Sequence, residues 1–318
     1  GDSAVFNGVK YLTDFTDTKK KLTTILDKAD KKSKYQQLLS DTLSTNKDIK
    51  IDGLYKIIGE EKIIYDDGQL KLEVLAPIAE KVTIAGSEQY VLRWFADDVG
   101  KTKNGHSVVI MAHIGKLKVL LGGDLNSKSA DFIMSQYSGQ ELEVLKASLE
   151  KAKTEQAKAK IQKQIDAVVE VCRPVLGCDV AKSCHHGSHD ITNEFLRVLN
   201  PIATVISSGD EESFCHPRPE TLGAIGKYSR GDRPLVYSTE LSRSSPEYLT
   251  LEMIKVKTDK EKQRLVSTYG MIALRSDGKN TIITQKLEKP TSRFGLIVKW
   301  QIDKLIWNDE RQDFVSKH

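Results

Sequence analysis

The chain has 318 residues, enough to bury one large core or two modest ones. Its 39% hydrophobic and 29% charged residues are typical of a soluble globular protein, and no run of about 18 apolar residues predicts a membrane span. The net charge is +4, and lysines gather near 19–34 and 146–163. These stretches are typical of solvated helix faces, and a phosphate-tracking surface is the alternative.

The cysteines exclude two common motifs. Four are present, at Cys172, Cys178, Cys184 and Cys215, and none forms a C-x-x-C pair, so a zinc ribbon or thioredoxin motif is not predicted. Because the count is low for this length, we expect free thiols in a reducing compartment and a cytoplasmic location.

Helical and then strand patterns fill the first third of the chain. Residues 11–47 predict helix, because leucines and isoleucines recur among lysines with few breakers. From Ile51 onward short apolar runs alternate, with a turn at Asp67–Gly68, and they predict strands.

The clearest hairpin runs from His106 to Asp124. Two apolar runs flank a turn, and reflection about Gly115 places His106 opposite Asp124, where side chains of antiparallel strands lie about 5 Å apart. Gly122 and Gly123 let the backbone turn sharply before Asp124. The sequence therefore predicts a His–Asp pair at the open end of this hairpin.

A long helix or helical pair follows, and we expect it to be an insertion at about 140–171. The segment DVAKSCHHGSHD then ends a short strand in three histidines, His185, His186 and His189. Alternating strands and helices continue, and after residue 243 the pattern is mostly strand-like, with a hairpin at 276–279. Alternation of this kind predicts α/β layering with ligands at strand ends.

Three explanations fit the histidine cluster from the residues alone: a catalytic metal loop, a structural metal site, or a hydrogen-bonded polar cluster. A hydrolytic metal site needs imidazoles and carboxylates on a rigid frame, and His106, Asp124, His185 and His186 have these types at predicted strand ends. His113 is expected to be exposed, and Cys184 to be a small buried residue. His189 and Asp190 are expected to cap the next helix.

The segments NGHSVVIMAHIGKLKVLLGGDLN, DVAKSCHHGSHD and CHPRPETLGAI together resemble the metallo-β-lactamase-fold hydrolases, in particular their ComEC-like branch. The family's N-x-x-S, G-D-L, K-x-x-H-H-G-S and H-P motifs match Asn104–Ser107, Gly123–Leu125, Lys182–Ser188 and His216–Pro217. The resemblance covers about residues 50–290.

The resemblance implies an αββα sandwich with two metal ions, Zn or Mn, at the strand ends. It implies Asp124 as the bridging ligand, His106 as a ligand from the preceding strand, and His185 or His186 as the last ligand. His216 would line the site near the substrate, so Asp124, His185 and His216 are the expected catalytic residues. We expect one hydrolase domain over 1–290 and a C-terminal extension over 291–318 that packs on it.

One departure concerns the family's H-x-H-x-D-H motif, which precedes the others, whereas this chain has no histidine before His106. We expect a preceding segment or a partner fragment to supply that motif. The expected activity is a metal-dependent hydrolase, a phosphodiesterase or nuclease in which metal-bound hydroxide attacks a phosphodiester. The alternatives are a non-catalytic binding or scaffold module on the same fold, and an acyl or thioester hydrolase.

Overall fold

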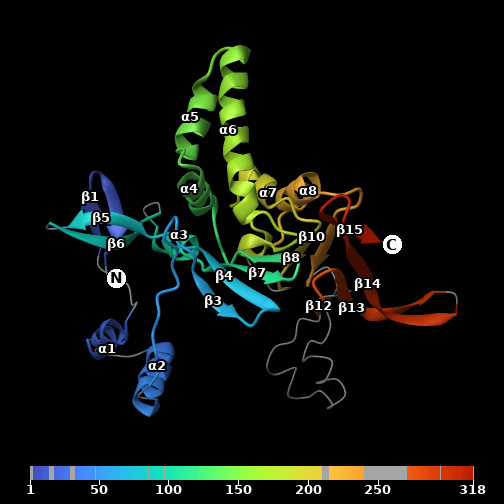
Figure 1. Ribbon diagram of the computed structural model, residues 1–318, viewed down its shortest axis with the longest axis horizontal. Coiled ribbons are helices and arrows are strands. Elements are labelled where there is room, and N and C mark those ends of the chain that lie inside the picture. Colours follow the sequence, from blue (N-terminus) through green and yellow to red (C-terminus); the bar gives the residue numbers. More distant parts are fainter. Residues whose placement is uncertain are drawn as a thin grey trace.

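The computed structural model describes residues 3–13, 18–28, 33–46, 48–84, 86–95, 98–209, 215–239, 271–293 and 295–317. They form a mixed α/β architecture around a seven-stranded sheet (Figure 1). Helices cover one face of this sheet, and the four-stranded sheet near the C-terminus packs on it through a second core. The predicted mixing of strands and helices is therefore confirmed.

The central sheet combines parallel and antiparallel strands. In spatial order it contains β11 (Leu235–Ser238), β10 (Ala203–Ile206), β9 (Val180–Lys182), β8 (Leu117–Leu121), β7 (Val109–Ile114), β4 (Leu70–Ala76) and β3 (Ile63–Asp66). Strands β8 to β11 are parallel, whereas β3, β4, β7 and β8 pair antiparallel. The carboxyl ends of β8, β9 and β10 therefore meet at the edge where β7 begins.

The β3–β4 hairpin has the predicted turn. The Asp67 carboxylate accepts hydrogen bonds from the backbone N–H groups of Gln69 and Leu70, at 2.9 and 2.8 Å. Gly68 has φ +83°, a left-handed conformation that glycine adopts at little cost. The turn chemistry of an Asp-Gly pair thus sets this hairpin, as expected from the sequence.

The helical layer packs over one face of the sheet. It consists of α4 (Ser127–Ser138), α5 (Leu142–Lys151), α6 (Glu155–Leu176), α7 (Asn193–Leu199) and α8 (Pro219–Tyr228). Met111 and Leu120 of the sheet are fully buried in one core with Met134 of α4 and Val169 of α6. Figure 1 shows α5 and α6 side by side, extending away from the sheet. The segment expected to be an insertion thus forms a helical pair, and its second helix continues past residue 171.

The C-terminal sheet contains β12 (Ile272–Ser276), β13 (Asn280–Arg293), β14 (Leu296–Asn308) and β15 (Asp313–Lys317). A second core joins it to the central sheet, with Ile283, Leu305 and Phe314 packing on Leu117 and Val180. The boundary expected at 290/291 falls inside β13, and one sheet holds residues from both sides of it.

The N-terminal part forms a smaller sheet of β1 (Ser3–Phe6), β2 (Val9–Leu12), β6 (Ser87–Arg93) and β5 (Glu80–Ile84). The helices α1 (Lys19–Asp27) and α2 (Lys34–Thr45) follow β2, and α3 (Val99–Gly105) precedes β7. The helical prediction for 11–47 is thus confirmed for α1 and α2, and it is wrong at residues 11–12, which belong to β2. Among the described helices, none combines the length and the apolar content needed to cross a bilayer.

Candidate functional site

The candidate site lies where three parallel strands end and β7 begins. Asp124 is in the loop after β8, His185 and His186 follow β9, and Ser207 follows β10. Ser107 precedes β7. Strand ends at one edge of an open α/β sheet are the usual place for ligands, because loops there are free to carry polar groups.

Two hydrogen bonds hold the Asp124 loop against the histidine loop. The Gly123 carbonyl accepts from the Lys182 ammonium at 2.8 Å and from the His185 backbone N–H at 3.1 Å. Gly123 has φ +58°, and a Cβ there would lie 2.6 Å from the Ser107 Cβ. A Cβ on Gly122 would lie 2.5 Å from the Cys184 sulfur. The two glycines therefore permit this close approach of loops.

Asp124 and His186 face each other at the centre of the site. The Asp124 Oδ1 is 3.4 Å from the His186 Nε2, and the two side chains are 39% and 45% exposed. The His186 Nδ1 lies 2.6 Å from the Ser207 carbonyl oxygen. Since a carbonyl only accepts, Nδ1 carries the proton, and a neutral ring presents the Nε2 lone pair toward the carboxylate.

His185 and His216 form a second pair in the same loop region. Their ring centroids are 5.9 Å apart in an edge-to-face arrangement, and His216 is buried. The Asn104 side-chain nitrogen lies 3.4 Å from the His185 Nε2. The His185 Nδ1 is buried and has no hydrogen-bond partner within the described part of the chain.

The backbone of the histidine loop is held in an uncommon conformation. His185 has φ 48° and His186 has φ 54°, both in the left-handed region that residues other than glycine seldom adopt. Gly187 follows with φ +82°, and a Cβ there would lie 2.7 Å from the Pro217 Cβ. Such strain costs about 1–3 kcal/mol per residue and is concentrated at functional sites.

The predicted pairing of His106 with Asp124 is wrong. The hairpin register pairs Ile110 with Leu121, one residue away from the reflection expected about Gly115. Continued past the strands, this register brings Ser107 to Asp124, and the Asp124 backbone N–H donates to the Ser107 Oγ at 2.8 Å.

His106 itself is the C-cap of α3 and not a strand residue. Its Nε2 is 2.7 Å from the Arg93 carbonyl oxygen, and its ring packs on Phe95 with centroids 4.9 Å apart. Burial lowers the pKa of His106 below its ordinary value, and the Arg93 carbonyl opposes that shift. The His106 Nε2 is thus occupied by a backbone partner.

Lys182 adds a positive charge beside the carboxylate. Its ammonium nitrogen is 3.7 Å from the Asp124 Oδ1. The side chain of Lys182 is only 23% exposed, so this charge stays close to the pair of loops. The Lys182 ammonium would attract an anionic substrate that approaches Asp124.

A polar network behind the site ties the two loops together. The Asp190 carboxylate accepts from the Ser127 Oγ at 2.5 Å and from the Ser127 backbone N–H at 3.2 Å. The predicted capping role of Asp190 and His189 is wrong, because Thr192 caps α7 by accepting from Phe195 N–H. Asp190 therefore joins the start of α4 to the histidine loop.

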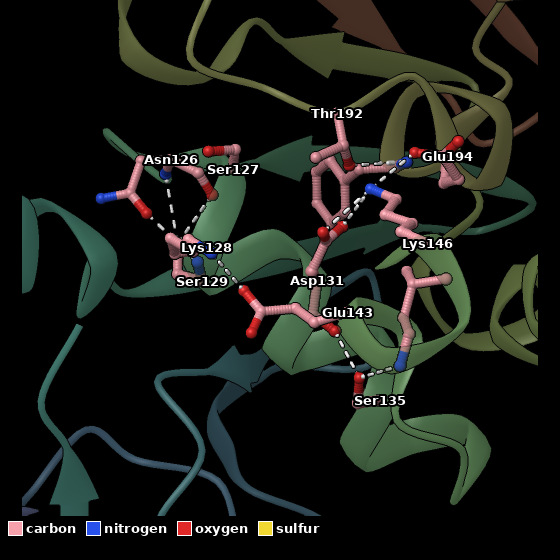
Figure 2. Close-up of polar contacts among 12 residues, drawn as sticks. Asn126, Ser127, Lys128, Ser129, Asp131, Ser135, Glu143, Lys146, Thr192 and Glu194 are labelled. Atoms are coloured by element: carbon pink, nitrogen blue, oxygen red, sulfur yellow. Dashed lines mark hydrogen bonds and ion pairs between the residues drawn. The ribbon is translucent and has the colours of Figure 1, made fainter. Parts of the chain in front are cut away.

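Figure 2 shows a second polar cluster, in which Lys146 of α5 points between Asp131 of α4 and Glu194 of α7. The Lys146 Nζ lies 2.8 Å from a carboxylate oxygen of each. Burial raises the pKa of Asp131, and the Lys146 ammonium opposes that shift. The three charges connect the helical pair to the helix after the histidine loop.

Other candidates from the sequence fall outside this site. His113 is only 24% exposed and lies 3.4 Å from Glu73, so its predicted exposure is wrong. Cys184 is buried as expected, and burial raises the pKa of its thiol to about 12.

Four contributors to the site were not among the predicted site residues: Asn104, Ser107, Lys182 and Ser207. The first three stand in the N-x-x-S and K-x-x-H-H-G-S segments, so the signal was present in the quoted motifs. Ser207 acts through its backbone carbonyl, and since every residue has one, the sequence does not indicate this role.

The donor types suit a divalent metal, but their number is low. A ligating histidine ordinarily donates its other ring N–H to a carbonyl or carboxylate, as His186 does to Ser207. Catalytic zinc sites use three protein ligands. Over the described ranges, no group of three or more His, Cys, Asp and Glu side chains is arranged to hold a metal ion. Asp124 and His186 thus fit as two ligands of an incomplete set.

No protein-family model, curated protein or solved structure matches this chain.

Proposed function

We propose that the Asp124–His186 site is part of a divalent-metal hydrolase centre that acts on phosphodiesters, in a metallo-β-lactamase-like αββα sandwich. In this proposal Asp124 and His186 are two metal ligands, and the remaining ligands come from residues other than the described ones. Zn and Mn are the expected metals, since both accept imidazole and carboxylate ligands.

One observation carries the proposal. The hydrogen bond from His186 Nδ1–H to the Ser207 carbonyl fixes the ring so that Nε2 faces the Asp124 Oδ1 at 3.4 Å. With a neutral ring these are two acceptors with no proton between them, an arrangement that a cation stabilises. The alternative occupant is a proton, which would make the contact a His–Asp ion pair.

The surrounding residues suit a phosphodiester. A bound divalent metal lowers the pKa of its water to about 7 and supplies hydroxide at neutral pH. Lys182, 3.7 Å from Asp124, places an ammonium group where it attracts a non-bridging phosphate oxygen. His185, whose buried Nδ1 has no hydrogen-bond partner among the described residues, and the adjacent His216 provide imidazoles for orienting the substrate or moving a proton.

Metal binding by the whole chain tests the two-ligand assignment. We expect Mn²⁺ or Zn²⁺ to bind with a one-to-one component in calorimetric titrations, and Asp124→Ala and His186→Ala to weaken it by at least about tenfold. His189→Gln is the matched control, because His189 is an exposed histidine in the same loop. A metal affinity unchanged in both site variants would refute the assignment.

The reaction class needs a separate test. A bis(aryl) phosphodiester and an aryl thioester, each assayed with and without the metal, distinguish phosphoryl from acyl hydrolysis. Hydrolysis that requires the metal, prefers the phosphodiester and disappears in Asp124→Ala is expected. Preference for the thioester would instead assign acyl hydrolysis to the site.

A non-catalytic scaffold is the second candidate, and a specific observation favours it. The β7–β8 register brings Ser107, and not His106, to Asp124, so this hairpin supplies a hydroxyl there and no third imidazole. A scaffold predicts that neither metal binds stoichiometrically and that Asp124→Ala leaves partner binding unchanged. The metal titration therefore separates the two functions.

A further inference from the structure

The β13–β14 hairpin carries an exposed apolar tip. Arg293 pairs with Leu296 and Ser292 with Ile297, so these are the last pairs of the hairpin toward its tip. Leu296 is 71% exposed and Ile297 is 72% exposed. Figure 1 shows that β13 and β14 extend together away from the rest of the molecule.

Leu296 and Ile297 point to opposite faces of the hairpin, because successive side chains of a strand alternate. Both are exposed, so no element among the described residues covers either side chain. A flat protein surface would cover one face and leave the other apolar side chain in water. Only an environment that surrounds the tip buries both.

The charge of the hairpin suits an anionic environment. In sequence, residues 286–300 contain Lys286, Lys289, Arg293 and Lys299 against a single acidic residue, Glu288. Lysine and arginine stems pack along apolar surroundings while their charged ends reach headgroups. Basic residues near a membrane surface attract phosphatidylserine and other anionic lipids.

Trp300 adds an amphipathic ring below the tip. The Lys286 ammonium lies 5.9 Å from the centre of this ring, across the hairpin. From Leu296 to Trp300 the strand rises about 13 Å, at about 3.3 Å per residue. Elements that lie in the membrane interface bury their apolar side chains by about 5–10 Å, which places Trp300 and Lys286 at the headgroup level.

We infer that the β13–β14 tip is a membrane-docking element that inserts Leu296 and Ile297 into the interface of an anionic bilayer. This places the candidate site on a protein that associates peripherally with a lipid surface. The inference rests on the hairpin alone and does not depend on the proposed hydrolase function.

Vesicle flotation of the whole chain tests it. We expect binding to vesicles of phosphatidylcholine with about one-third phosphatidylserine, and much weaker binding to pure phosphatidylcholine. The double variant Leu296→Ser/Ile297→Ser should lose at least about tenfold in vesicle affinity. Since both side chains are exposed, its circular dichroism and thermal midpoint should match those of the wild type.

Ile302→Ser is the matched control. Ile302 lies on the same strand and is 57% exposed, but it is about 20 Å from Leu296 along β14. Its vesicle affinity should stay within about twofold of the wild type. Absence of wild-type binding to anionic vesicles, or equal binding by the double variant, would overturn the inference.

A basic hairpin also suits a nucleic acid, and the same variants distinguish nucleic-acid binding from membrane binding. If the chain binds a single-stranded oligonucleotide but no vesicles, and the double variant loses the oligonucleotide, the tip is a nucleic-acid contact and the membrane assignment is wrong. Binding to vesicles that is lost in the double variant and kept in Ile302→Ser supports it.

Discussion

The Asp124 backbone N–H donates to the Ser107 Oγ at 2.8 Å, and this bond joins the two ends of the β7–β8 hairpin. It fixes the backbone from which the Asp124 carboxylate extends toward His186. A hydroxyl, not an imidazole, thus lies opposite the carboxylate-bearing loop. The position of Asp124 is therefore set by the β7–β8 register, which differs by one residue from a reflection about Gly115.

Ser107→Ala removes that bond. We expect a loss of about 1 kcal/mol in the free energy of unfolding, measured by urea titration. Because Ser107 positions a proposed ligand, metal affinity should also fall by about tenfold or more. Ser87→Ala, which removes an exposed hydroxyl, is the control and should change stability by less than about 0.5 kcal/mol. Unchanged stability and metal affinity in Ser107→Ala would contradict the positioning role.

Gly123→Ala tests the close approach of the two loops. Its Cβ would meet the Ser107 Cβ at 2.6 Å, in addition to the strain of φ +58°. Gly139 has φ +70° and open space around it, so Gly139→Ala carries the backbone strain alone, about 1–2 kcal/mol. Gly123→Ala should lose about 1–3 kcal/mol more in urea unfolding. Equal losses in the two variants would show that the loops move apart at no cost.

Lys146→Met tests the buried ion network of Figure 2. It leaves Asp131 and Glu194 without their cation, and since Lys146 is 25% exposed we expect a loss of about 2–3 kcal/mol near neutral pH. Lys128→Met breaks the exposed pair with Glu143 and should cost under about 1 kcal/mol. Comparable losses in the two variants would contradict burial as the cause.

The same variant should change how stability depends on pH. Burial raises the pKa of Asp131 above 3.8, so its contribution to stability is fully present below pH 3.8 and is lost as the pH rises through the raised value. Without the Lys146 ammonium that pKa rises further. Lys146→Met should therefore lose more stability than the wild type between pH 3.8 and neutrality, and Asp131→Asn should reduce the difference to the part that comes from Glu194. Parallel pH profiles would be the contrary result.

Arg230 links the C-terminal sheet to the central one. Its guanidinium forms ion pairs with Asp179 and Asp313 and donates to the Cys178 and Asn200 carbonyls, at 2.8 and 2.6 Å. Arg230→Lys cannot make this fork of bonds, and we expect a loss of about 3 kcal/mol in urea unfolding.

Arg233→Lys is the control for this substitution. Arg233 is 51% exposed and lies 3.8 Å from Asp303, so its replacement should cost under about 1 kcal/mol. A loss in Arg230→Lys no larger than that would mean that apolar packing alone holds the C-terminal sheet.

Local chemistry in the sequence predicted the elements well. Asp67–Gly68 sets the β3–β4 turn, and the pattern after residue 140 predicts the pair α5 and α6. The hairpin at 276–279 also forms, with the Asp277 carboxylate accepting from the Lys279 and Asn280 backbone N–H groups. Turn residues and helix periodicity act over a few residues, so they can be read without the fold.

The sequence by itself determined that Asp124 and the pair His185–His186 each follow a strand, because apolar runs stop at those residues. Only the tertiary structure decided their partners. The register of β7 and β8 brings Ser107 to Asp124 and leaves His106 on Phe95, and a one-residue shift suffices for this because strand side chains alternate faces. The Ser207 carbonyl, which sets the ring of His186, arrives from β10 through parallel pairing with β9, a contact between segments distant in the chain.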